Sequence, residues 1–267
     1  MLNNITMGQY YPVDSPIHRL DPRTKLVLTI AFIVAVFLVS HLAGYILILG
    51  FIYGTAKLAG IPFRMLWKGL RPLRIILIFT FLLNLFFTAG EDVLLSFWRI
   101  RITREALLQA VFYSLRLVFL VLGTSLLTLT TSPVALSDAL EQLLTPLKKI
   151  HFPAHELAMM MTIALRFIPT LLDETDKIMK AQMARGADFE SGNLISRAKA
   201  MVPLLVPLFV SAFRRAGDLA MAMESRCYHG GEGRTRFRVM KMTKQDGMAF
   251  AIVTLLIVLI ILERIFL

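Results

Sequence analysis

The chain has 267 residues, of which 57% are apolar and only 18% are charged, and its net charge is +11. This combination indicates a membrane protein with several spans and a basic cytoplasmic portion, because Lys and Arg gather on the cytoplasmic side of membrane proteins. No RNA- or DNA-binding motif accompanies the basic charge, so nucleic acid is not an expected partner. A single cysteine, Cys227, excludes an intrachain disulfide framework.

The first apolar stretch, residues 26–56, contains no Lys, Arg, Asp or Glu. Just before it, Asp21 can cap a helix whose first residue is Pro22. One perpendicular span needs only about 20 residues, and basic residues flank the stretch on both sides. The positive-inside rule places both flanks in the cytoplasm, which predicts two short spans that turn near 40–44. One tilted helix over the whole stretch is the alternative.

Later apolar runs predict three further spans. The third span covers 75–89, the fourth returns over about 105–131, and the fifth covers 248–262 near the C-terminus. Arg116 lies well inside the fourth span, where a charge must find a partner or face the interior of the bundle. Backbone carbonyls or Asn84 could satisfy it.

Three amphipathic helices are predicted between the fourth and fifth spans. The first starts at Ser132-Pro133, a capping residue followed by a proline suited to the first helical position, and should lie at the interface. Two longer ones lie within 154–229 and carry apolar residues at helical spacing, but we expect them to be too charged to cross a bilayer comfortably. Frequent Lys and Arg mark this whole part of the chain as cytoplasmic.

The predicted fold class is therefore an all-α integral membrane protein, with about five transmembrane helices and three cytoplasmic or interfacial amphipathic helices. The predicted organisation is an N-terminal membrane domain (1–132), a cytoplasmic coupling domain (133–245) and a C-terminal transmembrane helix (246–267). The coupling domain ends in a basic run, which should face the anionic lipid of the bilayer.

Each of the two long amphipathic helices runs into an arginine followed by a small residue. The first ends Ala184-Arg185-Gly186 and the second ends Ser225-Arg226-Cys227. Gly186 is the residue type expected just past a helix C-terminus, where the backbone turns left-handed. An arginine at this position complements the negative end of the helix dipole, and its guanidinium can project toward a carboxylate on another protein.

The two arginine-ended helices can be aligned with each other. Placing Arg185 on Arg226 superposes two amphipathic helices of similar length. Each helix carries a proline well upstream, Pro169 in the first and Pro207 in the second. Two equivalent projecting arginines predict two equivalent binding grooves on partner proteins. A transporter driven by a pair of ATPase subunits has that geometry.

Two groups of side chains offer alternative chemistry. Asp173, Glu174 and Asp176 resemble a magnesium-binding cluster and define the main alternative, a polytopic membrane enzyme, although nearby lysines favour a solvated, internally paired patch. His151 and His155 have a possible metal-binding spacing, but Pro153 lies between them. A secondary transporter and a structural scaffold are further alternatives. There is no Walker A motif, local triad motif or dinucleotide fingerprint, so we expect no catalysis and no bound cofactor.

Four segments together resemble the transmembrane T component of energy-coupling factor (ECF) transporters, and the resemblance covers nearly the whole chain. The segments are Leu20-Asp21-Pro22-Arg23-Thr24-Lys25, Thr130-Thr131-Ser132-Pro133, Arg166-Phe167-Ile168-Pro169 and Ala184-Arg185-Gly186. The last one is the most specific, because two Ala-Arg-Gly-like motifs end the coupling helices in this family and dock into grooves on two ABC-type ATPase subunits.

The resemblance implies a docking role for six residues. Ala184, Arg185 and Gly186 match the motif fully, whereas Ser225, Arg226 and Cys227 keep the arginine but change both neighbours. We do not expect Cys227 to cap its helix as glycine does.

The resemblance also implies the partners. The chain would be a non-catalytic subunit that links two ATPases, which bind the ATP, to a small membrane-embedded S component that delivers a vitamin or metal ion. It would lie in the cell membrane, with its N-terminus and coupling domain in the cytoplasm. The cargo itself would be recognised by the S component.

Overall fold

The computed structural model describes residues 10–88, 92–97, 100–150, 152–187, 189, 193–230 and 240–266. These residues are helical except for one short β-hairpin and the connecting segments, which confirms the all-α fold class. The chain divides into two units. Among the described residues, the bundle unit comprises 10–139 and 240–266, and the long-helix unit comprises 140–230, with the gaps given above.

The first apolar stretch forms two helices, α1 (Pro22–Leu38) and α2 (Leu42–Leu58), so the single tilted helix is wrong. The helix start is also confirmed, because the Asp21 carboxylate accepts a hydrogen bond from the Arg23 backbone N–H at 2.9 Å and Pro22 is the first helical residue. Each helix has 17 residues, as two short spans require.

The rest of the bundle unit continues from α2. Its helices are α3 (Phe63–Leu70), α4 (Arg74–Phe87), α5 (Arg104–Thr130) and α9 (Lys244–Phe266), with a 3₁₀ turn, Arg71–Leu73, between α3 and α4. The link between α4 and α5 contains an antiparallel hairpin of β1 (Val93–Phe97) and β2 (Ile100–Thr103), which the sequence analysis did not predict.

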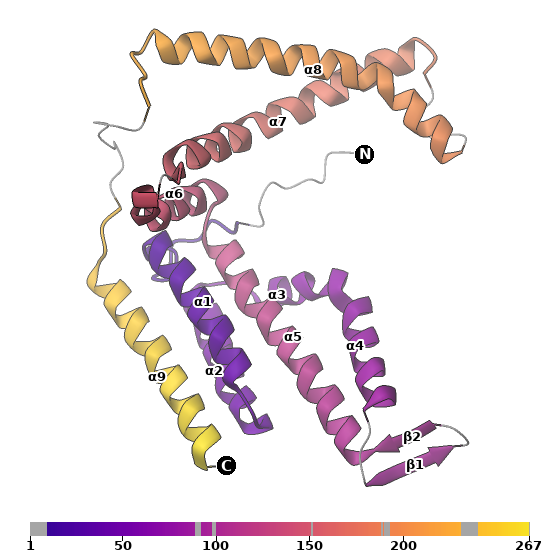
Figure 1. Ribbon diagram of the computed structural model, residues 1–267, viewed down its shortest axis with the longest axis vertical. Helices are drawn as coiled ribbons and strands as arrows, with labels where there is room; N and C mark the ends of the chain where they lie inside the picture. Colours follow the sequence, from indigo (N-terminus) through magenta and orange to yellow (C-terminus); the bar gives the residue numbers. More distant parts are fainter. Residues whose placement is uncertain are drawn as a thin grey trace. The chain divides into compact units, whose positions relative to one another are not determined.

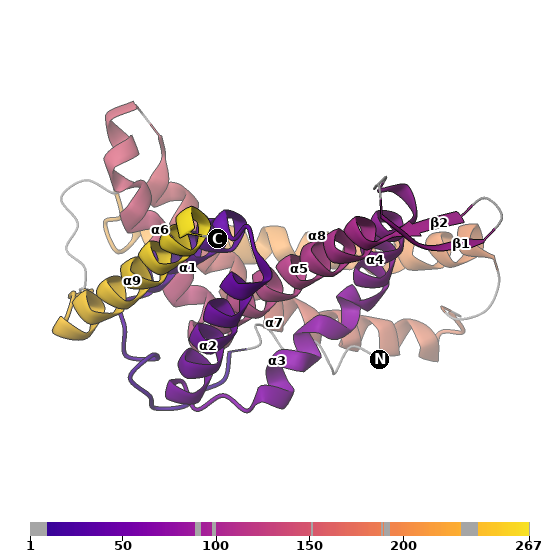
Figure 2. The ribbon, with the colours of Figure 1, turned by 90° about the horizontal axis from the view of Figure 1, so that it is seen from below.

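Helix α5 packs against α1, α2, α3 and α4, while α9 packs against α1 and α2 (Figures 1 and 2). Large side chains from several of these helices form the buried core, including Ile48, Ile52, Leu66, Leu129 and Ile260. The turn between α1 and α2, the β-hairpin and the C-terminal end of α9 all lie at one end of the bundle (Figure 1). The helices therefore alternate in direction, as the predicted spans require.

Four stretches are long and apolar enough to cross a membrane: 63–87, 104–130, 154–184 and 244–266, with α2 as a shorter apolar helix. Together they support an integral membrane protein. The stretch 154–184 is among them, although we expected it to be too charged to cross a bilayer. Most of its charged residues gather between Asp173 and Lys180, so its N-terminal half is apolar enough to form a span. Its location outside the bilayer stays a prediction.

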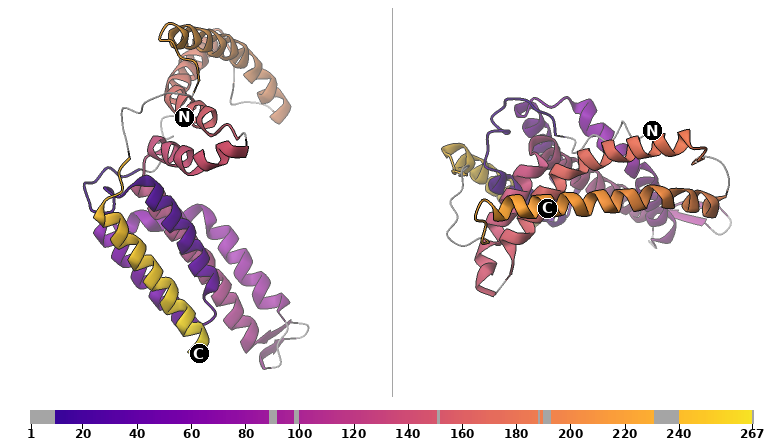
Figure 3. Two further views of the ribbon diagram at one scale, coloured as in Figure 1. Left: turned by 60° about the vertical axis from the view of Figure 1, so that its left-hand side comes forward. Right: turned by 90° about the horizontal axis from the view of Figure 1, so that it is seen from above.

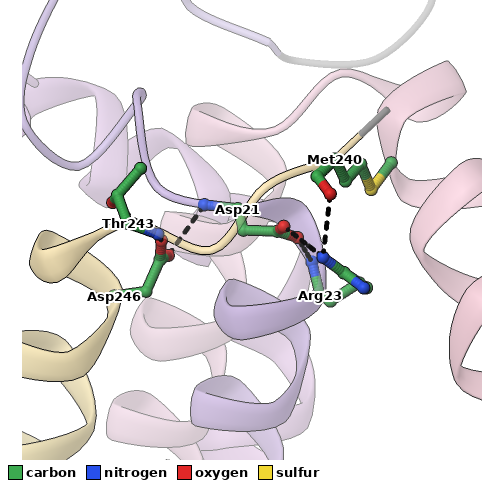
Figure 4. Close-up of polar contacts among 5 residues, drawn as sticks. All are labelled: Asp21, Arg23, Met240, Thr243 and Asp246. Atoms are coloured by element: carbon green, nitrogen blue, oxygen red, sulfur yellow. Dashed lines mark hydrogen bonds and ion pairs between the residues drawn. The ribbon is translucent and has the colours of Figure 1, made fainter. Parts of the chain in front are cut away.

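A polar cluster joins the start of α1 to the start of α9 (Figure 4). The buried carboxylate of Asp246 accepts hydrogen bonds from the backbone N–H groups of Asp21 and Thr243, at 2.9 and 2.7 Å. Asp21 also pairs with Arg23 at 2.7 Å, and Arg23 donates to the Met240 carbonyl. Because burying an unpaired carboxylate is costly, these bonds specify where the C-terminal helix attaches to the bundle.

A second cluster holds the segment that precedes α1. The buried Lys25 ammonium donates to the carbonyls of His18 and Thr130, at 3.1 and 2.9 Å. The His18 ring is 2.7 Å from the Ser15 hydroxyl and 2.9 Å from the Tyr11 carbonyl. Burial lowers the pKa of His18 below its ordinary value, which favours the neutral ring that these two bonds accommodate.

Arg116 in α5 finds partners within the bundle, although its buried Nε has no hydrogen-bond partner among the described residues. Its guanidinium donates to the Val39 carbonyl at 3.2 Å and lies 4.9–5.6 Å from the centroids of three aromatic rings, those of Phe37, Phe112 and Tyr113. A backbone carbonyl and ring faces thus stabilise this charge. The partner found for Arg116 is the Val39 carbonyl rather than Asn84, whose amide NH2 donates to the Thr80 carbonyl of its own helix.

The amphipathic helices are α6 (Pro133–Leu144), α7 (Ala154–Ala184) and α8 (Leu194–Glu224), with a 3₁₀ helix, Thr145–Ile150, after α6. The predicted start of α6 is confirmed, because the Ser132 hydroxyl accepts the Ala135 N–H at 3.3 Å. Helices α7 and α8 lie against each other in opposite directions, so their C-terminal ends are at opposite sides of the pair (Figures 1 and 3). Residues 231–239, which hold most of the basic run, lie outside the described residues.

Candidate functional site

Helix α7 ends in a Schellman cap at the first arginine motif. The Gly186 N–H donates to the Met183 carbonyl at 2.9 Å, and the Ala187 N–H donates to the Gln182 carbonyl at 3.0 Å. Gly186 has a φ of +88°, the left-handed conformation that this cap requires. Glycine adopts it without a steric penalty, so the backbone reverses immediately after Arg185.

Helix α8 ends in the same kind of cap at the second arginine motif. The Cys227 N–H donates to the Glu224 carbonyl at 2.9 Å, and the Tyr228 N–H donates to the Met223 carbonyl at 3.1 Å. Cys227 has a φ of +54°, so the expectation that it does not cap as glycine does is wrong for the backbone. The β-carbon costs about 1–2 kcal/mol in this conformation, and the two capping bonds offset it.

Both arginines project from these caps into solvent. Ala184, Arg185, Gly186, Ser225, Arg226 and Cys227 are all exposed. In the part of the chain that the structure describes, no side chain pairs with either guanidinium. The structure thus brings each motif together locally and places the two motifs at opposite sides of the α7–α8 pair (Figure 3).

Three side chains connect α7 to α8 between the two motifs. Arg215 donates to Glu174 across the interface, with 2.9 Å between Nη2 and Oε2. The Ser211 hydroxyl donates to the other oxygen of Glu174 at 2.6 Å, and Arg215 Nε lies 3.4 Å from the same hydroxyl. Both carboxylate oxygens of Glu174 therefore have partners on α8.

Beside these three residues, an apolar cavity of about 310 Å³ lies between α7 and α8. Its lining is mostly aliphatic and aromatic: Ile163, Phe167, Leu171, Ala212, Arg215, Ala216, Leu219, Ala220 and Met223. Further along, α8 exposes a row of large apolar side chains, each at least 50% accessible: Val202, Leu205, Val206, Phe209 and Phe213. Such a contiguous exposed surface marks an interaction site with a protein or a membrane.

The end of α8 makes a further contact with the start of α7. Nε2 of His155 lies 3.4 Å from the Tyr228 hydroxyl, and Nδ1 lies 2.9 Å from a carboxylate oxygen of Glu141. Tyr228 directly follows the second motif, so these contacts tie that cap to the start of α7. The corresponding position after the first motif is Ala187, which has no side-chain hydrogen-bonding group.

The two alternative metal sites gain no support from this geometry. Glu174 pairs with α8, and no three potential metal-binding side chains come together among the described residues. Both ring nitrogens of His155 face protein groups, and His151 lies outside the described residues.

Sequence reasoning placed both arginines at helix ends but missed the side-chain contacts around α7 and α8: those of Ser211, Arg215 and Tyr228, and the pairing of His155 with Glu141. One signal was available. The alignment that places Arg185 on Arg226 also places Glu174 on Arg215. The opposite charges at these aligned positions were a hint of the ion pair between the helices.

The chain matches known proteins over almost its full length. The profile of a family described as Cobalt transport protein (CbiQ) matches residues 14–237. The Thermosediminibacter oceani protein named energy-coupling factor transporter transmembrane protein EcfT is 57% identical over 98% of this chain and 99% of its own length. The Clostridium kluyveri protein of that name is 54% identical over 99% of this chain and 98% of its own length. The Bacillus subtilis protein of the same name is 52% identical over 92% of this chain and 93% of its own length. The chain therefore belongs to the family of energy-coupling factor transporter transmembrane proteins, and the resemblance found in its sequence is confirmed.

Proposed function

We propose that this chain is the coupling subunit of an ATP-driven importer. Its two arginine caps dock two ABC-type ATPase subunits, and α7 and α8 pass the movement of those subunits to a membrane-embedded S component that binds a vitamin or another micronutrient. The observation that carries the proposal is the pair of equivalent caps, each of which presents one exposed arginine at a fixed backbone reversal.

An arginine at a helix end suits a contact that must transmit force. The cap fixes the position of the arginine backbone, and the guanidinium can form two parallel hydrogen bonds to a carboxylate in a partner's groove. Loss of one partner from a desolvated interfacial charge pair costs about 2–5 kcal/mol. One docked arginine lies at each side of the α7–α8 pair. When the two ATPases close on each other, the two arginines therefore move the helix pair.

The S component would bind an apolar surface of the long-helix unit. The exposed row on α8 and the cavity beside it offer aliphatic and aromatic side chains to a hydrophobic partner. The S component would bind the cargo and the ATPase subunits would bind the ATP. This chain therefore needs no cofactor of its own. The distribution of Lys and Arg supports a cytoplasmic location for the N-terminus and for 133–245.

Co-purification tests this proposal. The tagged chain is expressed in its native membrane, solubilised gently and purified, and the wild type is compared with the double variant Arg185→Glu, Arg226→Glu. Matched controls are Lys177→Glu and Arg214→Glu, which make the same charge change at positions of α7 and α8 away from the caps.

We expect two ABC-type ATPases and a small hydrophobic protein to co-purify with the wild type and with both controls. The double variant should lose the ATPases while remaining in the membrane. A wild-type chain that purifies alone, or a double variant that retains both ATPases, would contradict the proposed function.

A further inference from the structure

The two residues that pair across the α7–α8 interface, Glu174 and Arg215, occupy equivalent positions in the two helices. Glu174 precedes Arg185 by the same interval, three helical turns, by which Arg215 precedes Arg226. At a rise of 1.5 Å per residue, each arginine is about 16 Å along its helix from the ion pair. Helices α7 and α8 run in opposite directions (Figure 1), so equal intervals along the two helices place the ion pair midway between the two docking arginines.

At this midpoint, Glu174, Arg215 and Ser211 all contact one another. Glu174 uses both carboxylate oxygens, one toward Arg215 at 2.9 Å and one toward Ser211 at 2.6 Å. Arg215 and Ser211 also approach each other, at 3.4 Å, so the three side chains form a closed set. The side chains of Arg215 and Glu174 are 37% and 24% accessible, which shields the pair partly from water.

The surroundings of the pair disfavour any other register. Arg215 borders the apolar cavity between the helices, and the residue one helical turn further along α8 is Leu219. A slip of one turn, about 5.4 Å, would bring Glu174 against this leucine and leave two charges without partners beside apolar side chains. Loss of both partners is unfavourable there, at a cost that partial exposure to water reduces.

We propose that Glu174, Arg215 and Ser211 form a central pin that sets the register of α7 against α8, and thereby the separation of Arg185 and Arg226. The three are positioning residues, because they act on the partners only through the two arginines. The inference rests on the proposed function and deepens it: two grooves on two ATPases can be engaged together only when the arginines are held at one separation.

The direct test measures that separation in the full chain in lipid nanodiscs, without partner proteins. One spin label is attached to the native Cys227, which is exposed, and one to an introduced Ala187→Cys, so each label follows one docking arginine. Distance distributions are recorded by pulsed electron paramagnetic resonance. The variants are Glu174→Arg, Arg215→Glu and the charge-swapped double variant Glu174→Arg, Arg215→Glu.

Each single reversal should broaden the distance distribution or shift its mean by about one helical turn, ~5 Å, and the charge-swapped double variant should restore a narrow distribution. Matched controls are Asp173→Arg and Arg214→Glu, which make the same charge changes one position away along each helix and should leave the distribution unchanged. Single reversals that behave like the wild type, or a double variant that is as broad as the singles, would overturn the pin.

A milder variant covers the case in which a charge reversal prevents folding. Glu174→Gln keeps the size of the side chain and can still bond Ser211, but it removes the charge that holds Arg215. We expect a distribution broader than that of the wild type, and an unchanged distribution would count against the pin.

A second readout connects the pin to transport in the complete complex purified from the native host. Substrate uptake per ATP hydrolysed should fall at least about fivefold in each single reversal and recover in the double variant. Unchanged coupling in the single reversals would refute the role of the pin in transport. If the wild-type chain binds no ATPase, the proposed function fails, while the nanodisc distances still decide whether the pin exists.

Discussion

The ends of α7 and α8 share one backbone geometry but are held in different ways. At the α7 end, glycine supplies the left-handed residue without strain, and Ala187 makes no side-chain hydrogen bond. At the α8 end, Cys227 takes the same conformation against a steric cost, and Tyr228 reaches His155 on α7. What the two ends have in common is the arginine at the reversal. If both ends dock ATPases as proposed, arginine placement is the feature that a partner requires, and the surrounding contacts are free to differ.

Substitution of either arginine should have the largest effect. Arg185→Ala and Arg226→Ala should each weaken ATPase binding by about 2–5 kcal/mol, and Arg185→Glu should weaken it more than Arg185→Ala, because glutamate adds repulsion against an acidic groove. Titration of purified ATPase subunits onto the chain in nanodiscs measures this. Similar losses at the two ends would support two equivalent grooves, whereas wild-type binding by the alanine and glutamate variants would argue against docking by arginine.

Substitution of the left-handed residue at the α7 end, Gly186, should have the next largest effect. Gly186→Cys imposes at this end the β-carbon that α8 already tolerates, and it should destabilise the α7 cap by about 1–2 kcal/mol. Hydrogen exchange of the Gly186 and Ala187 amides, which close the cap, reports the change, with the Cys227 and Tyr228 amides of the same sample as reference. Equal protection in variant and wild type would show that glycine is not required there.

Removal of the side-chain contact at the α8 end should have a smaller effect. Tyr228→Phe keeps the ring but loses the hydroxyl near His155, and it should cost about 0.5–1.5 kcal/mol. Amide exchange at Cys227 and Tyr228 should become faster, while exchange at Gly186 and Ala187 should not change. Tyr53→Phe, at an exposed tyrosine in α2, serves as a control. Slower or unchanged exchange at the α8 cap would show that the contact does not hold it.

The reverse substitution at the α8 end, Cys227→Gly, should have the smallest effect, and it should raise stability rather than lower it. Cys227→Gly relieves the steric cost of the left-handed conformation, but glycine also gains freedom in the unfolded chain. The net gain in stability should therefore be below about 1 kcal/mol. Thermal unfolding in nanodiscs should show a small increase in midpoint, and a decrease would mean that the cysteine side chain contributes contacts of its own to the cap.

Features that depend on a few neighbouring residues were predictable from the sequence. The capping pairs Asp21-Pro22 and Ser132-Pro133 begin helices where expected, because caps require only local geometry. The split of the first apolar stretch followed from basic residues on both sides of it. The α7 cap followed from Gly186 after the first arginine, and the place of the second arginine at a helix end followed from the alignment of one helix on the other.

Features that depend on packing between distant segments were not predictable. The contact of Tyr228 with His155 joins residues far apart in the sequence, and it exists only because α7 and α8 run in opposite directions. The hairpin at 93–103 has strands of only five and four residues, so no long alternating pattern marked it. The left-handed Cys227 was unexpected, since a residue's type gives its conformational preference but not the bonds that override it.

Site-specific photo-crosslinking at the residues that follow the arginines tests docking most directly. A benzophenone amino acid replaces Ala187 in one variant and the exposed His229 in another, and Tyr53 in the bundle unit is the control position. After illumination of native membranes, both test positions should form adducts with ATPase subunits, with the attachment sites in corresponding grooves, and the control should form none. Adducts only with lipid or with other membrane proteins, or ATPase adducts from one test position alone, would contradict the docking of two ATPases by two equivalent caps.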